Sequence, residues 1–469
     1  MMRRKLNEER GTAVPIVVAV IAVISILGLT AAYMVESQTT MGARYSGGEK
    51  ALAIAEAGVN EYLWHLNGDS KFYEDDGGFS ASDHTFQDGF YHLAVTPPDT
   101  ENPVVTITST GWPEGDLTNR RTVEVRVHKR QFVQNIYLSE VETALNGPNV
   151  CWITGDELWG PLHTNGTLYI DGDPIFHGPV TYSGGLDVKS GSDPTYEVPG
   201  YPLKVPKLEF PQTNGQLKTQ AQYNGYYYDG RTCILLDGDQ VKIRNRTGDV
   251  EIRPLPRNGV IYVDGTTNES NNAKWDLNTG NAFVSGKLDG RLTIATAKDI
   301  YITGRDPTNF TYNLASATGG VKYKNEDFDP DGGMTDDMLG LVAGGYVRIL
   351  HHNWPDAKND RSSPYYSTYN VSDVAPDNIT VDAAIFALDW AWEYEDHDSG
   401  EPKGSITLVG SLTQYYRGEV GTFNAGGRVT GYSKNYIHDP RMSYDSPPHF
   451  LEPVNVGWEI GSWREVPNP

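Results

Sequence analysis

The sequence has very few cysteines and lacks the motifs of the common enzyme classes. Only Cys151 and Cys233 occur in 469 residues, and no CxxC is present, which excludes a zinc knuckle and a thioredoxin-type site. HExxH, GxSxG, the P-loop and a strand-linked GxGxxG are also missing. We therefore expect no enzyme activity and no cofactor. The two cysteines remain candidates for a disulfide outside the cell, because the sequence does not give their separation.

Positive charge is also scarce. Lys and Arg number 38 against 61 Asp and Glu, so the formal net charge is -23. A surface of this sign repels the phosphates of nucleic acid, and we expect no nucleic-acid partner. Acidity of this degree suits a soluble extracellular surface, and attraction of cations is the alternative interpretation.

Charge is missing altogether between residues 11 and 35, although 21% of the chain is charged. A bilayer core is crossed by about 20 apolar residues in a helix, which predicts a transmembrane helix over 12–35. A cleaved signal peptide has a shorter apolar core. Residues 1–11 form a basic leader, and positive residues stay in the cytoplasm. We predict a single-pass protein of the cell membrane whose amino terminus is cytoplasmic and whose bulk is extracellular.

The helical pattern continues beyond the length of a membrane span. No proline occurs between Gln38 and Leu66, and glycines at 42, 47 and 48 are potential bends. We predict an amphipathic continuation of the helix over 36–67. Its apolar face consists of residues at three-and-four spacing, namely Leu52, Ala55, Val59, Tyr62, Leu63 and Leu66.

The rest of the sequence is typical of β structure. Apolar residues alternate with polar ones in three runs (91–95, 105–108 and 122–128), which predicts a small antiparallel sheet over 84–130 under the helix. The expected fold class is therefore mainly β with a long N-terminal α-helix.

From residue 131 the chain changes to short strands broken by Asn-Gly, Asp-Gly and Gly-Gly pairs. This pattern of short strands and turns predicts an extracellular, right-handed β-solenoid-like domain over 131–430, and a β-sandwich with insertions is the alternative. The Pro-rich segment 197–212 is expected to pack along one face of it. Residues 431–469 are expected to form an irregular tail.

The N-terminal segment resembles a known family. It reads RGTAVPIVVAVIAVISILGLTAAYMVESQTT and, after a short gap, GEKALAIAEAGVNEYLWHL. These stretches are similar to the PilX-type N-terminal segment of type IV pilus minor subunits. Both have a basic leader, a Gly followed by small residues, a long apolar run and an AEAG box, here Ala55-Glu56-Ala57-Gly58. The resemblance implies a pilin-like stem that packs against the stems of other pilin-like subunits.

The same resemblance implies prepilin processing between Gly11 and Thr12. Pilins also carry a Glu at the fifth mature position, where this chain has Ile16. That Glu is thought to meet the amino terminus of a neighbouring subunit, and subunits without it are associated with filament tips or with initiation. An uncleaved single-span anchor is the alternative.

The C-terminal half carries a second resemblance. Its motifs are LGLVAGG, AAIFALD, GSITLVGSLTQYYRGEVGTF and GYSKNYIHDPRMSYDSPPHF, within 339–450. They resemble the closing module of uncharacterised bacterial surface proteins associated with pilus assembly. The resemblance brings no known chemistry with it.

One acidic loop is a candidate calcium site. Asp327, Asp329 and Asp331 alternate and are followed by Gly332, as at the start of an EF-hand loop, and Asp337 lies close behind. The twelfth position of the loop is Met338 instead of Glu, so an acidic surface turn is the alternative.

Two further groups of residues were weighed as sites. His351 and His352 are adjacent, and in a strand they would point to opposite faces, one buried and one solvated. Asp237, Asp264 and Asp289 would suit a solenoid enzyme that acts on polysaccharide only if two carboxylates faced one bond. Asp next to Gly is also a common turn pair.

These observations favour a membrane-anchored, pilin-like surface subunit with a structural or adhesive role, as a minor or tip component of a type IV pilus-like assembly. Its expected partners are the membrane, other pilin-like subunits and a glycan or another surface ligand. Two alternatives remain open: an anchored β-solenoid enzyme that acts on envelope polysaccharide, and a simple envelope protein without a filament.

Overall fold

The structure is a computed structural model. It describes residues 13–69, 71–99, 104–145, 147–267, 274–308, 319–324, 336–352, 373–424, 427–454 and 456–468. The chain divides into two units, and both ends of the sequence contribute to the first of them. The first unit comprises Met1–Pro98, Val104–His128 and Trp458–Pro469, and the second comprises Asp99–Pro103 and Lys129–Gly457.

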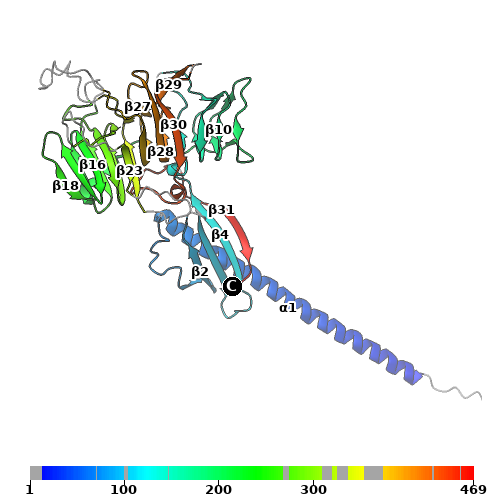
Figure 1. The fold of residues 1–469 in the computed structure, drawn as a ribbon. Helices are drawn as coiled ribbons and strands as arrows, with labels where there is room; N and C mark the ends of the chain where they lie inside the picture. Colours follow the sequence, from blue (N-terminus) through cyan, green and yellow to red (C-terminus); the bar gives the residue numbers. More distant parts are fainter. Residues whose placement is uncertain are drawn as a thin grey trace, which may run out of the picture. The chain divides into compact units, whose positions relative to one another are not determined.

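The first unit begins with one long helix, α1, which runs from Ala13 to Gly68 (Figure 1). Its 56 residues correspond to a rod of about 84 Å. The helix passes without interruption through the three glycines that were potential bends. Pro15 falls in the first turn, where the N–H that proline lacks has no partner within the helix. The predicted helix and its continuation are therefore one element.

The sheet of the first unit has five strands in the order β1-β2-β3-β4-β31. The first four are successive antiparallel neighbours. The runs predicted from alternation are confirmed as β2, β3 and β4, whereas β1 and β31 were not predicted. The bounds are β1 Asp83–Phe86, β2 Gly89–Thr96, β3 Val105–Pro113, β4 Arg121–Lys129 and β31 Trp458–Val466.

The second half of α1 covers one face of this sheet. Every other residue of β2, β3 and β4 is buried against it, as expected for strands with one face turned to a core. The helix contributes Ile54, Ala55, Val59, Tyr62 and Leu66, and the sheet contributes Tyr91, Leu93, Val105, Ile107, Val123, Val125 and Val127.

The prediction of an irregular tail over 431–469 was wrong. This segment contains the end of β30 (Gly427–His438), the 3-10 helix η2 (Pro440–Ser443) and β31. β31 is exposed along most of its length on both faces, so it has no alternating apolar pattern that a sequence reading would detect. Ion pairs accompany its pairing with β4: Arg464 binds Glu124 at 2.7 Å, and Glu465 binds Arg121 at 2.7 Å.

The second unit is dominated by a 23-stranded sheet in which most neighbours are parallel. Antiparallel hairpins add β17 (Gln240–Asn245), β18 (Glu251–Pro254) and β29 (Gly421–Asn424). One continuous parallel series contains β15 Tyr226–Asp229, β19 Val260–Asp264, β21 Arg291–Thr296, β24 Met338–Ala343, β26 Ile379–Ala387, β28 Pro402–Gln414, β5 Tyr137–Ser139, β8 Leu162–Thr164, β11 Val180–Tyr182 and β14 Leu203–Lys204.

The remaining strands of this sheet pair mainly in parallel with one another or with members of that series. They are β16 Thr232–Gly238, β20 Ala282–Leu288, β22 Ile300–Ile302, β23 Gly320–Tyr323, β25 Val347–Ile349, β27 Trp392–Tyr394, β30 Gly427–His438, β7 Glu157–Trp159, β10 Ile175–Phe176 and β13 Thr195–Tyr196. A separate three-stranded sheet consists of β6 Trp152–Ile153, β9 Leu168–Asp171 and β12 Leu186–Val188. Parallel pairing of this extent differs from the antiparallel pairing of a β-sandwich.

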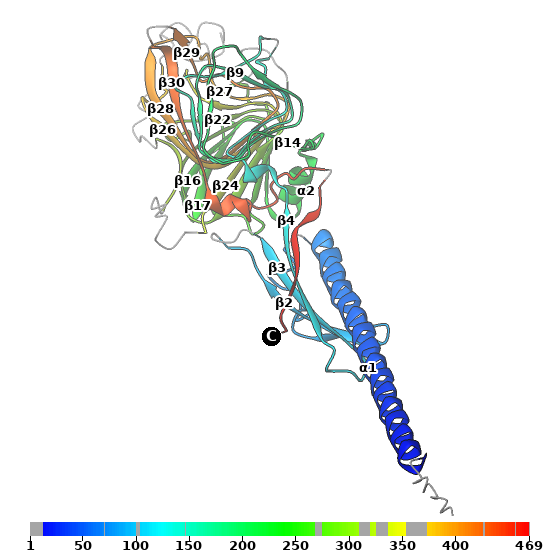
Figure 2. The same cartoon turned by 90° about the vertical axis from the view of Figure 1, so that its right-hand side faces the viewer.

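The order of the coils differs from the order of the sequence. The chain builds β5 to β14 first, then passes through α2 (Gly215–Asn224) to β15 at the opposite end of the parallel series. From there it returns strand by strand until β28 pairs with β5, so that Leu412 lies opposite Tyr137. β26, β28 and β30 lie side by side in this part of the sheet (Figure 2). The junction contains a buried ion pair, in which Arg417 Nη1 lies 2.8 Å from Glu142 Oε2. The last coils therefore close onto the first ones.

Apolar side chains fill the coils and also cover one outer face of the parallel series. Ile261 and Val263 point into the main core, whereas Val260 and Tyr262 of the same strand join the outer cluster. α2 and the 3-10 helix η1 (Phe132–Gln134) pack on that outer face. The Pro-rich segment packs there as predicted, with Leu208 and Phe210 buried.

Candidate functional site

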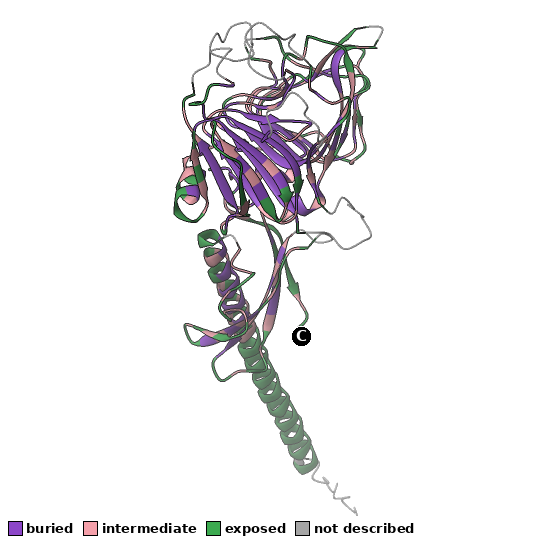
Figure 3. Cartoon of the chain, turned by 60° about the vertical axis from the view of Figure 1, so that its left-hand side comes forward, coloured by how far each residue is buried: buried purple, intermediate pink, exposed green. Residues whose placement is uncertain are grey.

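The first half of α1 is exposed on all sides. Every residue from 14 to 46 is exposed, whereas burial begins close to Gly47 (Figure 3). Val14, Leu29 and Tyr33 are exposed by 71%, 71% and 78%. Exposed apolar surface of this extent on a protein marks an interaction with a membrane or with other proteins. We refer to the uncharged residues 14–35 as the apolar stem.

The apolar stem has the dimensions of a membrane span. Its rise is about 33 Å, and the hydrocarbon core of a bilayer is ~30 Å thick. By length and composition, α1 is the one helix in the described part of the chain that meets the requirements for crossing a membrane. The Thr30 hydroxyl donates to the Ile26 carbonyl at 2.7 Å, so this polar group is satisfied within the helix, as lipid requires.

The AEAG box lies where α1 meets the sheet. Ala55 is fully buried, and Gly58 faces Tyr91 and Ser109. A Cβ at position 58 would lie 2.5 Å from Tyr91 Cδ2 and 2.7 Å from Ser109 Oγ, which is closer than side-chain carbon atoms approach in real structures. The box therefore has a packing role: its small residues bring the helix backbone close to β2 and β3.

Gly111 on β3 is the sheet residue that lies against the backbone of this part of α1. A Cβ on Gly111 would lie 2.4 Å from the Ala55 nitrogen and 2.5 Å from the Ala51 oxygen, and both are backbone atoms that no rotamer change can move. Sequence reasoning did not single out Gly111. An isolated glycine within an alternating strand is the available signal, because it often marks a close approach of another backbone.

The predicted processing site and most of the predicted calcium site lie outside the described residues. These are Gly11 and Thr12 for processing, and Asp327, Asp329 and Asp331 for calcium. Both assignments stay predictions.

The fourth predicted calcium ligand, Asp337, is described and fully buried. Its Oδ1 accepts a hydrogen bond from the Gly290 N–H at 2.6 Å, and its carbonyl oxygen accepts one from Arg441 Nη1 at 2.8 Å. In this structure the carboxylate therefore ties the start of β24 to the preceding coil.

The candidate disulfide between Cys151 and Cys233 is not formed in this structure. Cys151 and Cys233 are both free thiols. Cys233 is buried in β16 beside Trp275 and Phe283, whereas Cys151 precedes β6 in the separate three-stranded sheet. A disulfide requires Cα atoms about 4.4–6.8 Å apart, whereas Cys233 belongs to the large sheet and Cys151 directly precedes a strand of another sheet. Burial raises the pKa of the Cys233 thiol to about 12.

The acidic residues considered for polysaccharide chemistry are each paired with a lysine. The nitrogen–oxygen distances are 2.8 Å for Asp237 and Lys242, 2.6 Å for Asp264 and Lys218, and 2.7 Å for Asp289 and Lys324. Glycoside hydrolysis needs two carboxylates that face one bond, and these three instead face cations. That the protein has no enzyme activity stays a prediction.

Comparisons with known proteins add little to this geometry. No family model and no curated protein matches the sequence. Among solved structures, the chain is similar to the crystal structure of the competence-associated pilin ComZ from Thermus thermophilus, at 10% identity and a TM-score of 0.30, with 90% of this chain and 97% of that chain covered. A likeness at this score supports no conclusion about fold or function, so the functional interpretation depends on α1 and its packing.

Proposed function

We propose that the protein is a membrane-anchored, pilin-like surface subunit. Its apolar stem lies in the bilayer and then packs against the stems of other pilin-like subunits. The observation that carries this proposal is the division of one uninterrupted helix into a bare apolar half and a half that the small sheet covers. Such a long exposed apolar segment is expected only where the helix contacts a membrane or another protein.

Packing drives assembly in this proposal. Lipid chains are as apolar as the stem, so moving the stem from lipid to a bundle of stems gains close contacts and does not gain from dehydration. Small residues at Gly28, Ala31 and Ala32 give neighbouring backbones room to approach. The basic leader holds the amino terminus in the cytoplasm and places both β-rich units outside the cell.

The subunit would be a low-abundance component of the filament or would lie at its tip. Ile16 stands where pilins have the glutamate that contacts a neighbouring amino terminus, and the second unit is a large insertion between two segments of the first. We propose that the second unit is a right-handed β-solenoid, which acts as an adhesive or spacing module towards a glycan or another surface. The same Ile16 favours the second candidate function, an envelope anchor without a filament.

The mass of the mature amino terminus separates these two functions. For protein purified from the membranes of its host, we expect a chain that starts at Thr12, because cleavage after Gly11 would remove the basic leader and leave the stem to begin the subunit. A methylated amino group would agree further with prepilin processing. A chain that still begins at Met1 would contradict the filament function and support the simple anchor.

A further inference from the structure

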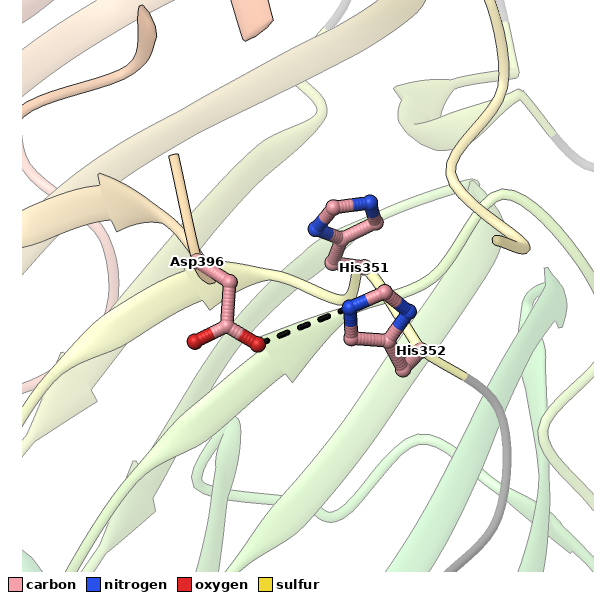
Figure 4. Close-up of side chains that lie close together, drawn as sticks. All are labelled: His351, His352 and Asp396. Carbon is pink, nitrogen blue, oxygen red and sulfur yellow. Dashed lines mark ion pairs between the residues drawn. The ribbon is translucent and has the colours of Figure 1, made fainter. Parts of the chain in front are cut away.

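Three side chains of types that bind metal ions meet in the second unit, whereas the helix that carries the proposed function belongs to the first unit. They are His351, His352 and Asp396, and one ligand atom from each lies within 4.8 Å of the others (Figure 4). His352 Nε2 lies 3.6 Å from Asp396 Oδ2. In a tetrahedral zinc site with ligand distances of about 2.0–2.1 Å, neighbouring ligand atoms are about 3.3 Å apart, so the three side chains must close in on an ion to bind it.

The register of the coils explains why these residues meet. β25 and β27 are parallel neighbours, and Ile349 lies opposite Tyr394. The residues that follow the two strands emerge at the same edge, with His351 and His352 on one coil and Asp396 on the next. β25 ends at Ile349, so the alternation of a strand does not apply to the two histidines. As expected, one of them is buried and the other is more exposed: the side chain of His351 is 1% exposed and that of His352 is 24% exposed. Their rings stack, with centroids 3.8 Å apart. Because the lone pair of an imidazole lies in the plane of its ring, one of the two rings must turn out of the stack when both bind one ion.

The tautomer of His351 suits a metal ligand. Its ring is 1% exposed, and Nδ1 lies 3.0 Å from the Glu395 carbonyl oxygen, which can only accept a hydrogen bond. Nδ1 therefore carries the proton, and the lone pair belongs to Nε2, which lies 3.7 Å from Asp373 Oδ2. A hydrogen bond of this kind orients metal-binding histidines in many proteins.

The space in front of this nitrogen is kept open by the turn that carries Asp396. Gly400 has a φ of +83°, and a Cβ at this position would lie 3.2 Å from His351 Nε2. Asp396 itself has a φ of +48°, an uncommon conformation for a residue other than glycine and one that often marks a functional site.

His352 and the carboxylate of Asp373 are the other polar groups next to His351. His352 Nδ1 is buried and has no hydrogen-bond partner among the described residues. Asp373 Oδ2 lies 3.7 Å from His351 Nε2 and is held by Lys403 at 2.8 Å. It stands at the rim of the cluster, where a fourth ligand or a water molecule would complete the coordination.

We propose that His351, His352 and Asp396 form a binding site for a divalent transition-metal ion, with zinc as the best fit. Two imidazoles and one carboxylate match the ligand preference of zinc, and calcium prefers a set made entirely of oxygens. The ion joins the segment that follows β25 to the segment that follows β27, and so links two neighbouring strands of the second unit.

The test uses the full chain, purified in detergent without a polyhistidine tag and treated with a chelator. Titration with Co²⁺ is expected to give one bound ion per chain, with the strong visible bands of tetrahedral cobalt, and Zn²⁺ is expected to displace it. Asp396→Asn and His352→Gln should each weaken binding at least tenfold. Asn tolerates a positive φ, so the first variant keeps the turn. If His352→Gln fails to fold, Asp396→Asn decides the test.

His177 provides a matched control. It also lies between carboxylates, with Nδ1 2.9 Å from Glu197 and Nε2 3.8 Å from Glu157. His177→Gln should bind Co²⁺ like the unmodified chain, and near-ultraviolet circular dichroism should show that all the variants are folded. The proposal is overturned if the unmodified chain gives no tetrahedral spectrum, or if folded Asp396→Asn binds cobalt as tightly as the unmodified chain.

Discussion

Removal of residues 1–35 is expected to convert the protein from a membrane-bound to a soluble form. The deletion takes away the apolar stem, whose exposed side chains lie in lipid in our proposal, and leaves the half of α1 that packs on the small sheet. The remaining exposed part of α1 begins at Glu36 and is more polar. We expect the full chain to float with liposomes in a density gradient and the shortened chain to stay at the bottom.

A pair of single substitutions refines this experiment. Ile24 and Tyr45 are both exposed on α1, but only Ile24 belongs to the apolar stem. A lysine near the centre of a membrane span costs about 2.5–3.5 kcal/mol, so Ile24→Lys should reduce the membrane-bound fraction, whereas Tyr45→Lys should leave it unchanged. Flotation of the shortened chain to the same extent as the full chain would show that another surface holds the protein to lipid.

Substitution of two glycines of α1 by alanine is expected to change stability in opposite directions. At Gly58 a Cβ would lie 2.5 Å from the Tyr91 ring, so the helix must move away from the sheet. Overpacking of this kind costs about 1–3 kcal/mol. At Gly48 a Cβ meets nothing within 4 Å, and the change should stabilise the helix by about 0.5–1 kcal/mol.

Hydrogen exchange of the amides in β2 and β3 of the detergent-solubilised chain measures both effects. The exchange rate should rise in Gly58→Ala and stay equal or fall in Gly48→Ala. Equal behaviour of the two variants would mean that the AEAG box does not hold α1 on the sheet. The pair is well matched because both sites lie in one helix and undergo the same chemical change.

Much of the first unit follows from local sequence patterns. Absence of charge predicts the stem, helical spacing predicts the covered half of α1, and alternation predicts β2, β3 and β4. β31 escaped prediction because it is exposed along most of its length and is recognised through pairing with β4 and through ion pairs such as that of Arg464 with Glu124. Such partners are distant in sequence, so no local pattern indicates them.

The arrangement of the second unit depends on long-range pairing and was predicted less completely. Short strands and Gly-rich turns indicate stacked coils, but nothing local indicates that β28 returns to β5. The cluster of His351, His352 and Asp396 depends in the same way on the register of Ile349 with Tyr394. For the same reason the sequence left open whether Cys151 and Cys233 are joined, since whether two cysteines meet depends on which strands are neighbours.

The most direct test of the membrane-embedded stem is the reactivity of single cysteines towards a water-soluble maleimide in intact membranes. Cys151 is replaced by serine, and Cys233 is retained because burial raises its pKa to about 12 and keeps the thiol unreactive. A cysteine at position 24 should then remain unlabelled until detergent is added, whereas a cysteine at position 45 should react at once. Equal and rapid labelling at both positions would place the stem in water and contradict the anchored, pilin-like assignment.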